Sequence, residues 1–81
     1  MTEKEKRTEP RHRVLKGGTI SFDGAGIDCT VRNLSGNGAG LEVASVQGIP
    51  PSFKLAIAAD HFLRRCHLVW NAGRRIGVSF D

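Results

Sequence analysis

The sequence predicts an all-β fold, a small antiparallel barrel, from three observations. Apolar and polar residues alternate in short runs, turn-forming residues separate these runs, and no stretch sustains the 3.6-residue periodicity of a confident helix. Five or six short strands fit into the 81 residues, and closure into a barrel removes exposed strand edges. A chain of this length has room for one domain with one modest core.

The first half of the barrel is expected to contain three strands. Residues 18–22 are the predicted first strand, and Asp23-Gly24 is a hairpin turn signal. The second strand ends at Asn33, and polar residues alternate with its inward positions, which are Ile27, Cys29 and Val31. The third strand alternates in the same way over Leu41, Glu42 and Val43.

The second half is expected to contain the remaining strands. Residues 48–51 break the chain before a fourth strand, whose inward residues are Phe53, Leu55 and Ile57. Residues 63–70 are the predicted fifth strand, and we assign Trp70 to the core or the barrel end in preference to ligand stacking. After a turn at residues 71–73, the last strand runs to the C-terminus with one buried face, formed by Ile76, Val78 and Phe80.

Charge is distributed unevenly along the chain. Residues 1–13 are predicted to be a flexible charged N-terminal arm, because they lack the apolar residues needed to fold alone, and residues 14–81 are the predicted barrel domain. The formal net charge of +4 favours anionic partners. Four arginines of the last two strands and their turn are assigned to a solvated edge, with a partner surface as the alternative: Arg64, Arg65, Arg74 and Arg75.

The residue pattern indicates neither catalysis nor metal binding. Cys29 and Cys66 lack metal-ligand spacing and are expected to be small buried hydrophobes. The three histidines are scattered, with no carboxylate or cysteine at triad or metal spacing, so we expect no enzyme, no metal site and no cofactor. The charged N-terminus is unlike a signal peptide, and no apolar run approaches membrane-spanning length, so we expect a cytoplasmic protein without a membrane partner.

Two short motifs carry the chemistry. The first, Arg7-Thr8-Glu9-Pro10-Arg11, has two guanidinium forks four positions apart. The second, Asn33-Leu34-Ser35-Gly36-Asn37-Gly38, offers an amide, a hydroxyl and glycine backbone that a guanine edge or a phosphate could approach closely. Each motif alone has an ordinary explanation, a solvated basic arm for the first and a β-turn for the second. Their occurrence in this order favours a nucleotide clamp.

This arrangement resembles the PilZ domain family, whose motif is RxxxR before the first strand and (D/N)xSxxG after the second. Val69-Trp70 and residues 76–80 at the end of the chain extend the resemblance. It implies a six-stranded β-barrel that binds cyclic di-GMP. Arg7 and Arg11 would pair with guanine, stack on it or neutralise phosphate, Asn33 and Ser35 would hydrogen-bond the other guanine, and Gly38 would admit the ligand to the backbone.

The register of the arm has an alternative. Arg13 is as close to the first strand as Arg11 and is an additional candidate for its role, although only Arg7 and Arg11 satisfy the RxxxR spacing. Asn33 stands where the family often has aspartate, and an amide offers one acceptor where a carboxylate offers two.

Three functions are in competition. The first is a non-catalytic receptor in which cyclic di-GMP orders the arm and so signals to a downstream protein partner. The second is a PilZ-like adaptor that binds a protein but no nucleotide. The third, a barrel that binds RNA or single-stranded DNA, is disfavoured because Phe53 and Phe80 follow the inward phase and tyrosine is absent.

Overall fold

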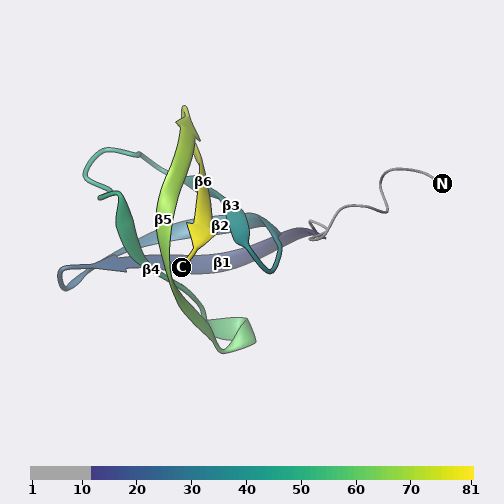
Figure 1. Cartoon of the computed structure of the whole chain (residues 1–81). Helices are drawn as coiled ribbons and strands as arrows, with labels where there is room; N and C mark the ends of the chain where they lie inside the picture. The colour runs from purple at the N-terminus through teal and green to yellow at the C-terminus, as the bar shows by residue number, and fades with distance from the viewer. Residues whose placement is uncertain (1–11) are drawn as a thin grey trace.

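A computed structural model describes residues 12–81, and the chain there forms a closed barrel of six strands (Figure 1). The strands follow one another around the barrel in the order β1-β2-β3-β6-β5-β4, and all neighbours are antiparallel. The all-β barrel prediction is therefore confirmed. The elements are β1 (His12–Phe22), β2 (Ala25–Leu34), β3 (Gly38–Val43), β4 (Ser52–Ile57), the short 3-10 helix η2 (Ala58–Asp60), β5 (Phe62–Ala72) and β6 (Arg75–Phe80).

The core fills the inside of the barrel, where the predicted inward positions of β2, β3, β4 and β6 meet. Full burial of one aliphatic or aromatic side chain contributes about 1.5–3 kcal/mol relative to exposure. The buried residues are Ile20, Cys29, Val31, Ala39, Leu41, Val43, Phe53, Leu55, Ile57, Cys66, Ile76 and Val78.

Both cysteines are free thiols in this core, as predicted. Burial raises the pKa of Cys29 to about 11, and the charge of Asp28 acts in the same direction. Burial also raises the pKa of Cys66 to about 12, assisted by the charge of Asp81 and by Cys29. Both groups therefore pack as neutral apolar side chains at neutral pH.

Strand β1 is longer than the predicted first strand, because it begins at His12 and not at residue 18. The glycines at positions 17 and 18 lie inside the strand and do not begin it. A Cβ on Gly18 would meet Val31 Cγ2 at 3.1 Å and the Ala56 carbonyl oxygen at 3.2 Å, so glycine lets β1 pass close to the core. His12 and Arg13 thus belong to a barrel strand, whereas residues 1–11 lie outside the described part and the predicted arm stays a prediction.

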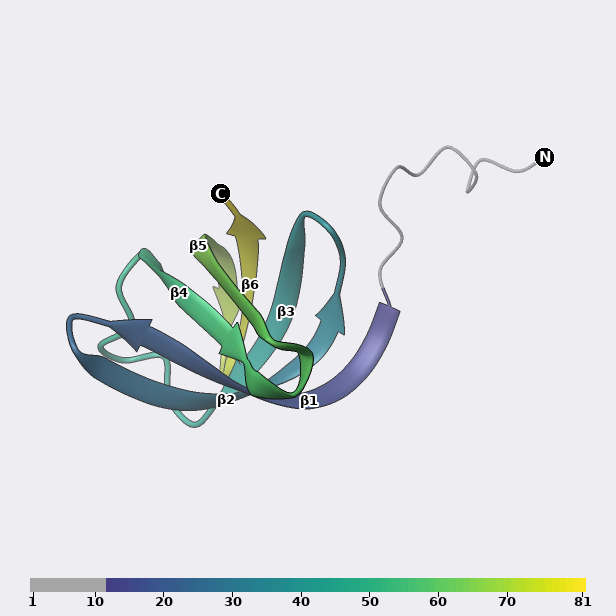
Figure 2. The same cartoon turned by 90° about the horizontal axis from the view of Figure 1, so that it is seen from below.

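The two ends of β1 define two ends of the molecule, the motif end and the hairpin end (Figure 2). At the motif end, His12 pairs with Leu34 next to the β2–β3 turn. At the hairpin end, Asp23 and Gly24 form the tight turn between β1 and β2, both with positive φ angles, 46° and 78°. The strand rises about 3.3 Å per residue, so its length separates the two ends by roughly 30 Å.

Candidate functional site

The β2–β3 turn at the motif end is held together by Ser35. The Ser35 Oγ accepts hydrogen bonds from the backbone N–H groups of Asn37 and Gly38, both at 3.2 Å, and donates to the Gly38 carbonyl at 3.3 Å. The Ser35 N–H also donates to that carbonyl, at 2.9 Å. A hydroxyl has one proton and two lone pairs, so these contacts use its full capacity. These hydrogen bonds therefore stabilise the turn without a ligand.

Gly38 closes the same turn onto β6. A Cβ at this position would overlap the Val78 carbonyl oxygen, which is a backbone atom. The Phe80 N–H also donates to the Asn37 carbonyl at 2.7 Å, which ties the turn to the last strand. The turn and β6 therefore form one rigid unit, and the glycine is needed for their close approach.

Asn33 lies on the outer surface, folded over a glycine of the next strand. A Cβ on its cross-strand partner Gly40 would meet Asn33 Nδ2 at 2.6 Å, so the amide lies where a side chain would otherwise stand. The register of β2 against β3 shifts between Val31 and Asn33. This bulge lets Arg32 and Asn33, although successive residues, both reach the outer face, where Arg32 contacts Glu42.

Asn33 belongs to a continuous row of five residues, one from each of five neighbouring strands. Each member is the cross-strand partner of the next, and two of them are adjacent glycines: Arg13, Asn33, Gly40, Gly77 and Trp70. We call it the glycine row. Five strands spaced about 4.8 Å apart give it a length of about 19 Å along the curved surface. It combines a guanidinium, an amide, two glycines and an indole.

Trp70 forms the far end of this row and is not in the core. Its side chain is 45% exposed, and a Cβ on Gly77 would overlap the indole, which lies against that glycine. The register shift between Leu68 and Trp70 leaves Val69 without a cross-strand partner, and Val69 is 58% exposed. Of the two predicted positions for Trp70, the core is therefore wrong: the bulge turns the indole outward, toward a hollow that it shares with the β2–β3 turn.

The other end of the row opens into a basic groove of about 680 Å³, lined by Arg13, Val14, Leu15, Arg32, Asn33 and Arg75. Small-molecule sites usually measure about 300–1,000 Å³, so the groove is large enough for a nucleotide. A register shift between Arg13 and Lys16 lies beside it, and Leu15 is 71% exposed there. All three register shifts around the barrel thus lie beside the glycine row.

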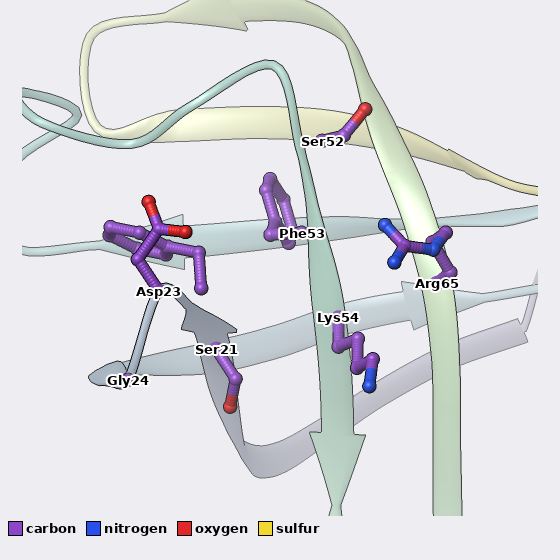
Figure 3. A pocket seen from close by; sticks show the side chains of 8 residues that line it. Ser21, Asp23, Gly24, Ser52, Phe53, Lys54 and Arg65 are labelled. Atoms are coloured by element: carbon purple, nitrogen blue, oxygen red, sulfur yellow. The ribbon is translucent and has the colours of Figure 1, made fainter.

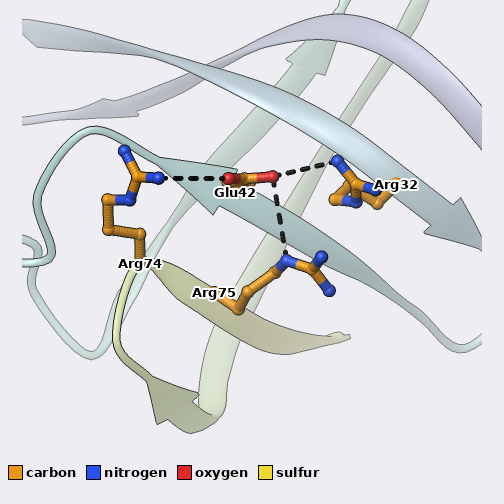
Figure 4. A network of polar contacts seen from close by, with 4 residues as sticks. All are labelled: Arg32, Glu42, Arg74 and Arg75. Atoms are coloured by element: carbon orange, nitrogen blue, oxygen red, sulfur yellow. Dashed lines mark hydrogen bonds and ion pairs between the residues drawn. The ribbon is translucent and has the colours of Figure 1, made fainter.

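Glu42 orients two of the groove's arginines (Figure 4). Its Oε1 lies 3.0 Å from Arg32 Nη1 and 3.7 Å from Arg75 Nε, and its Oε2 lies 3.9 Å from Arg74 Nη2. One carboxylate thus faces three guanidinium groups, which leaves a local excess of two positive charges. The four side chains are defined here as the Glu42 cluster. Its excess charge favours an anion with more than one negative group.

The predicted site residues divide into three sets. Arg7 and Arg11 lie outside the described residues. Arg13 and Asn33 are brought together as cross-strand partners in the groove, and Ser35 and Gly38 form the adjacent turn. Sequence reasoning missed three residues as members of the site, namely Arg32, Trp70 and Arg75. The signal for Trp70 is its register with Gly77, which depends on a bulge that alternation does not reveal. The signal for Arg32 and Arg75 is their contact with Glu42, which is the cross-strand partner of Arg75.

Residues 12–81 contain no group of three or more His, Cys, Asp or Glu side chains that could hold a metal ion. In the same part of the chain, no helix has the length and hydropathy that a membrane crossing requires.

Comparison with known proteins gave one family match. A family model described as PilZ domain matches residues 5–81, which is nearly the whole chain. A search of curated proteins found no match. The family match confirms the resemblance that the two motifs indicated.

Proposed function

The chain belongs to the PilZ domain family, and from this premise we propose that it is a receptor for cyclic di-GMP, the ligand that this family commonly binds. PilZ domains are typically non-catalytic receptors, so the proposal involves binding and no reaction. In our proposal the glycine row and the basic groove form the barrel's half of the site, and Arg7 and Arg11 form the other half.

The observation that carries the proposal is the cross-strand pairing of Arg13 with Asn33 inside the basic groove. A guanidinium can pair with guanine O6 and N7 or with a phosphate, and an amide can both donate to and accept from a base edge. Arg32 and Arg75 add charge for phosphate beside them. Cyclic di-GMP contains two guanines and two phosphates, and the groove offers groups suited to both.

Trp70 supplies a stacking surface in this proposal. Its exposed indole is part of the glycine row, and base stacking on an aromatic ring contributes about 1–3 kcal/mol per base. Ser35 and Gly38 support the site by shaping the turn, and their direct contact with guanine remains part of the proposal.

Signalling follows from closure of residues 1–11 on the ligand. Fixing one backbone residue costs about 1–2 kcal/mol, whereas one charge-assisted hydrogen bond contributes about 1.5–3 kcal/mol. Four or five such bonds from Arg7, Arg11 and Arg13 would offset the ordering of a few residues. The closed segment would then present a new surface to a downstream protein.

Isothermal titration calorimetry with cyclic di-GMP tests the proposal, with GTP and cyclic AMP as comparison ligands. We expect selective binding that weakens at least tenfold in Arg11→Ala and in Asn33→Ala, on the order of one lost charge-assisted bond. Arg13→Ala decides whether this arginine shares the role of Arg11. The matched control is Arg65→Ala, which removes the same side chain at the hairpin end of the molecule.

The absence of heat with cyclic di-GMP at high micromolar concentration would overturn the receptor proposal. Binding that is equal for GTP, or that Arg65→Ala weakens as much as Arg11→Ala, would show non-specific attraction to a basic protein. In either case the second candidate would lead.

The second candidate is a PilZ-like adaptor that binds a protein and no nucleotide. One observation favours it: Ser35 and Gly38 already have complete structural roles in the turn, so this part of the motif would be needed in a barrel that binds no ligand. The arginines distinguish the two candidates. Arg11→Ala would abolish ligand binding in a receptor and leave partner binding unchanged in an adaptor.

A further inference from the structure

A second cationic site lies at the hairpin end, on the outer face of β4 and β5. Lys54 and Arg65 are direct cross-strand partners there, and Ser21 of β1 pairs with Lys54 from the other side. Together with Ser52 they line a hollow of about 370 Å³ (Figure 3). The Asp23 carboxylate also lines it, from the β1–β2 turn, and in Figure 3 it lies across the hollow from the two cations.

The pairing of Lys54 with Arg65 is unfavourable in the free protein. Like charges directly opposite on neighbouring strands destabilise a sheet. Within residues 12–81, neither cation lies within 4.0 Å of a carboxylate oxygen.

The remaining described cations are accommodated, with one exception. Lys16 pairs with Asp60, three arginines pair with Glu42, and Arg64 lies 4.9 Å from the centre of the Phe80 ring. The exception is Arg13, which faces the proposed ligand groove. Lys54 and Arg65 likewise lack a carboxylate partner among residues 12–81, so we expect an external anion to bind them.

The surroundings of the two cations indicate the chemistry of the occupant. Leu63 follows the same outward phase of β5 as Arg65 and is 62% exposed. Two rings line the hollow: that of Phe53 is 2% exposed, and that of Phe22 is partly buried against the core, so neither is freely exposed for the stacking that single-stranded nucleic acids use. A guanidinium fork matches a carboxylate bidentately, and an exposed leucine suits an apolar neighbour.

We propose that this face binds an acidic segment of a partner protein, whose carboxylates pair with Lys54 and Arg65 and whose apolar side chain packs on Leu63. The segment binds through side chains, because Lys54 is paired with Ser21 on one side and with Arg65 on the other, so β4 offers no free edge there for strand addition. The site lies at the opposite end of β1 from the glycine row. It therefore goes beyond the proposed ligand site, and its test does not depend on cyclic di-GMP.

The test uses the full chain and a defined probe, a fluorescein-labelled Glu-Glu-Leu-Glu-Glu peptide. Fluorescence anisotropy gives the affinity, and ¹H-¹⁵N correlation spectra give the location. We expect chemical-shift changes at Ser21, Ser52, Lys54 and Arg65, and no such changes at the motif end. A peptide with glutamine in place of every glutamate is expected not to bind.

Variants separate this site from general attraction to a basic protein. Lys54→Gln combined with Arg65→Gln should weaken peptide binding about tenfold, on the order of two lost exposed charge pairs. Lys16→Gln combined with Arg64→Gln is the matched control, since it removes one lysine and one arginine that line neither the hollow nor the basic groove. Equal weakening in the control, or peptide shifts centred on Asn33, would overturn the proposal. Stronger binding of an oligothymidylate than of the peptide at the same site would replace a protein partner with nucleic acid.

A stability measurement adds an independent readout. Lys54→Glu should raise the melting temperature, because it converts a repulsive cross-strand pair into an attractive one, and should also abolish peptide binding. A merely structural role for Lys54 predicts a lower melting temperature, and that result would contradict the proposal. Cyclic di-GMP titrations of the same variant show whether the two sites are independent.

Discussion

Replacing Gly38 with alanine tests whether this motif glycine is required by the fold. The added Cβ would overlap the Val78 carbonyl oxygen, and a backbone atom of a paired strand cannot rotate away as a flexible side chain can. To admit the methyl group, β3 must move away from β6, which weakens the pairing of Gly38 with Ser79. The closure of the barrel passes through this pair of strands, so the strain acts on the whole fold.

The expected loss follows from two opposing effects. Forcing an extra methyl group into a packed site costs about 1–3 kcal/mol. Alanine also restricts the unfolded chain and recovers about 0.4–1 kcal/mol. The free energy of unfolding should therefore fall by about 1–2 kcal/mol, and the melting temperature of a domain of this size by roughly 5–15 °C. Gly17→Ala is the matched control, because a Cβ at Gly17 has no heavy atom within 4 Å.

Thermal and urea unfolding followed by circular dichroism measure the difference. We expect Gly17→Ala to melt at or slightly above the wild-type temperature and Gly38→Ala well below it. If the two variants melt together, the contact with Val78 does not constrain the barrel. A Gly38→Ala protein of unchanged stability that no longer bound cyclic di-GMP would show that this glycine serves the ligand directly.

Three further predictions concern the Glu42 cluster, the glycine row and the buried thiols. Glu42→Gln should lower the free energy of unfolding by about 1 kcal/mol or less, because the ion pairs of Glu42 are partly exposed. It should also tighten cyclic di-GMP binding in calorimetry at low salt, since it removes the negative charge beside the groove. Unchanged affinity would show that the ligand does not contact the cluster. Gly77→Ala should displace the Trp70 indole from its position and shift its fluorescence emission to longer wavelength, and an unshifted spectrum would contradict the contact. Burial raises the pKa of Cys29 to about 11 and of Cys66 to about 12, from an ordinary value of 9.0, so above pH 9 the unfolded chain loses thiol protons that the folded chain retains. The free energy of unfolding should therefore be full below pH 9 and decline as the pH rises toward 11, and urea titrations should show a smaller decline when both cysteines are alanine.

Alternation along the chain was sufficient to predict most of the barrel. Inward positions such as Val31, Leu55 and Ile76 follow a two-residue period, and each is buried. The first part of β1 could not be predicted in this way, because its pairing with the end of β2 involves a register shift and two glycines inside the strand. Trp70 was misassigned for a similar reason, since a bulge inverts which face of β5 it occupies.

The candidate site was predicted only where local chemistry is sufficient. Asn33 and Ser35 stand out because an amide and a hydroxyl side chain come just before two glycines, at the end of an alternating strand. Arg32 and Arg75 do not stand out, because an arginine on an outer strand position ordinarily faces solvent. Their assembly around Glu42 depends on three strands coming side by side, and β6 lies far from β2 in the sequence.

The order of strands around the barrel has a consequence for folding kinetics. Two of its six pairings, β1 with β4 and β3 with β6, join segments that are distant along the chain, as in Thr19 with Ala56 and Gly40 with Gly77. Such contacts form only after a long loop has closed, so β-barrels of this kind fold on a timescale of roughly milliseconds to seconds. The glycine row crosses the β3–β6 pairing, with three of its members on β1, β2 and β3 and the other two on β6 and β5. During synthesis, the surface that we propose for the ligand is therefore completed only when β6 has emerged and paired.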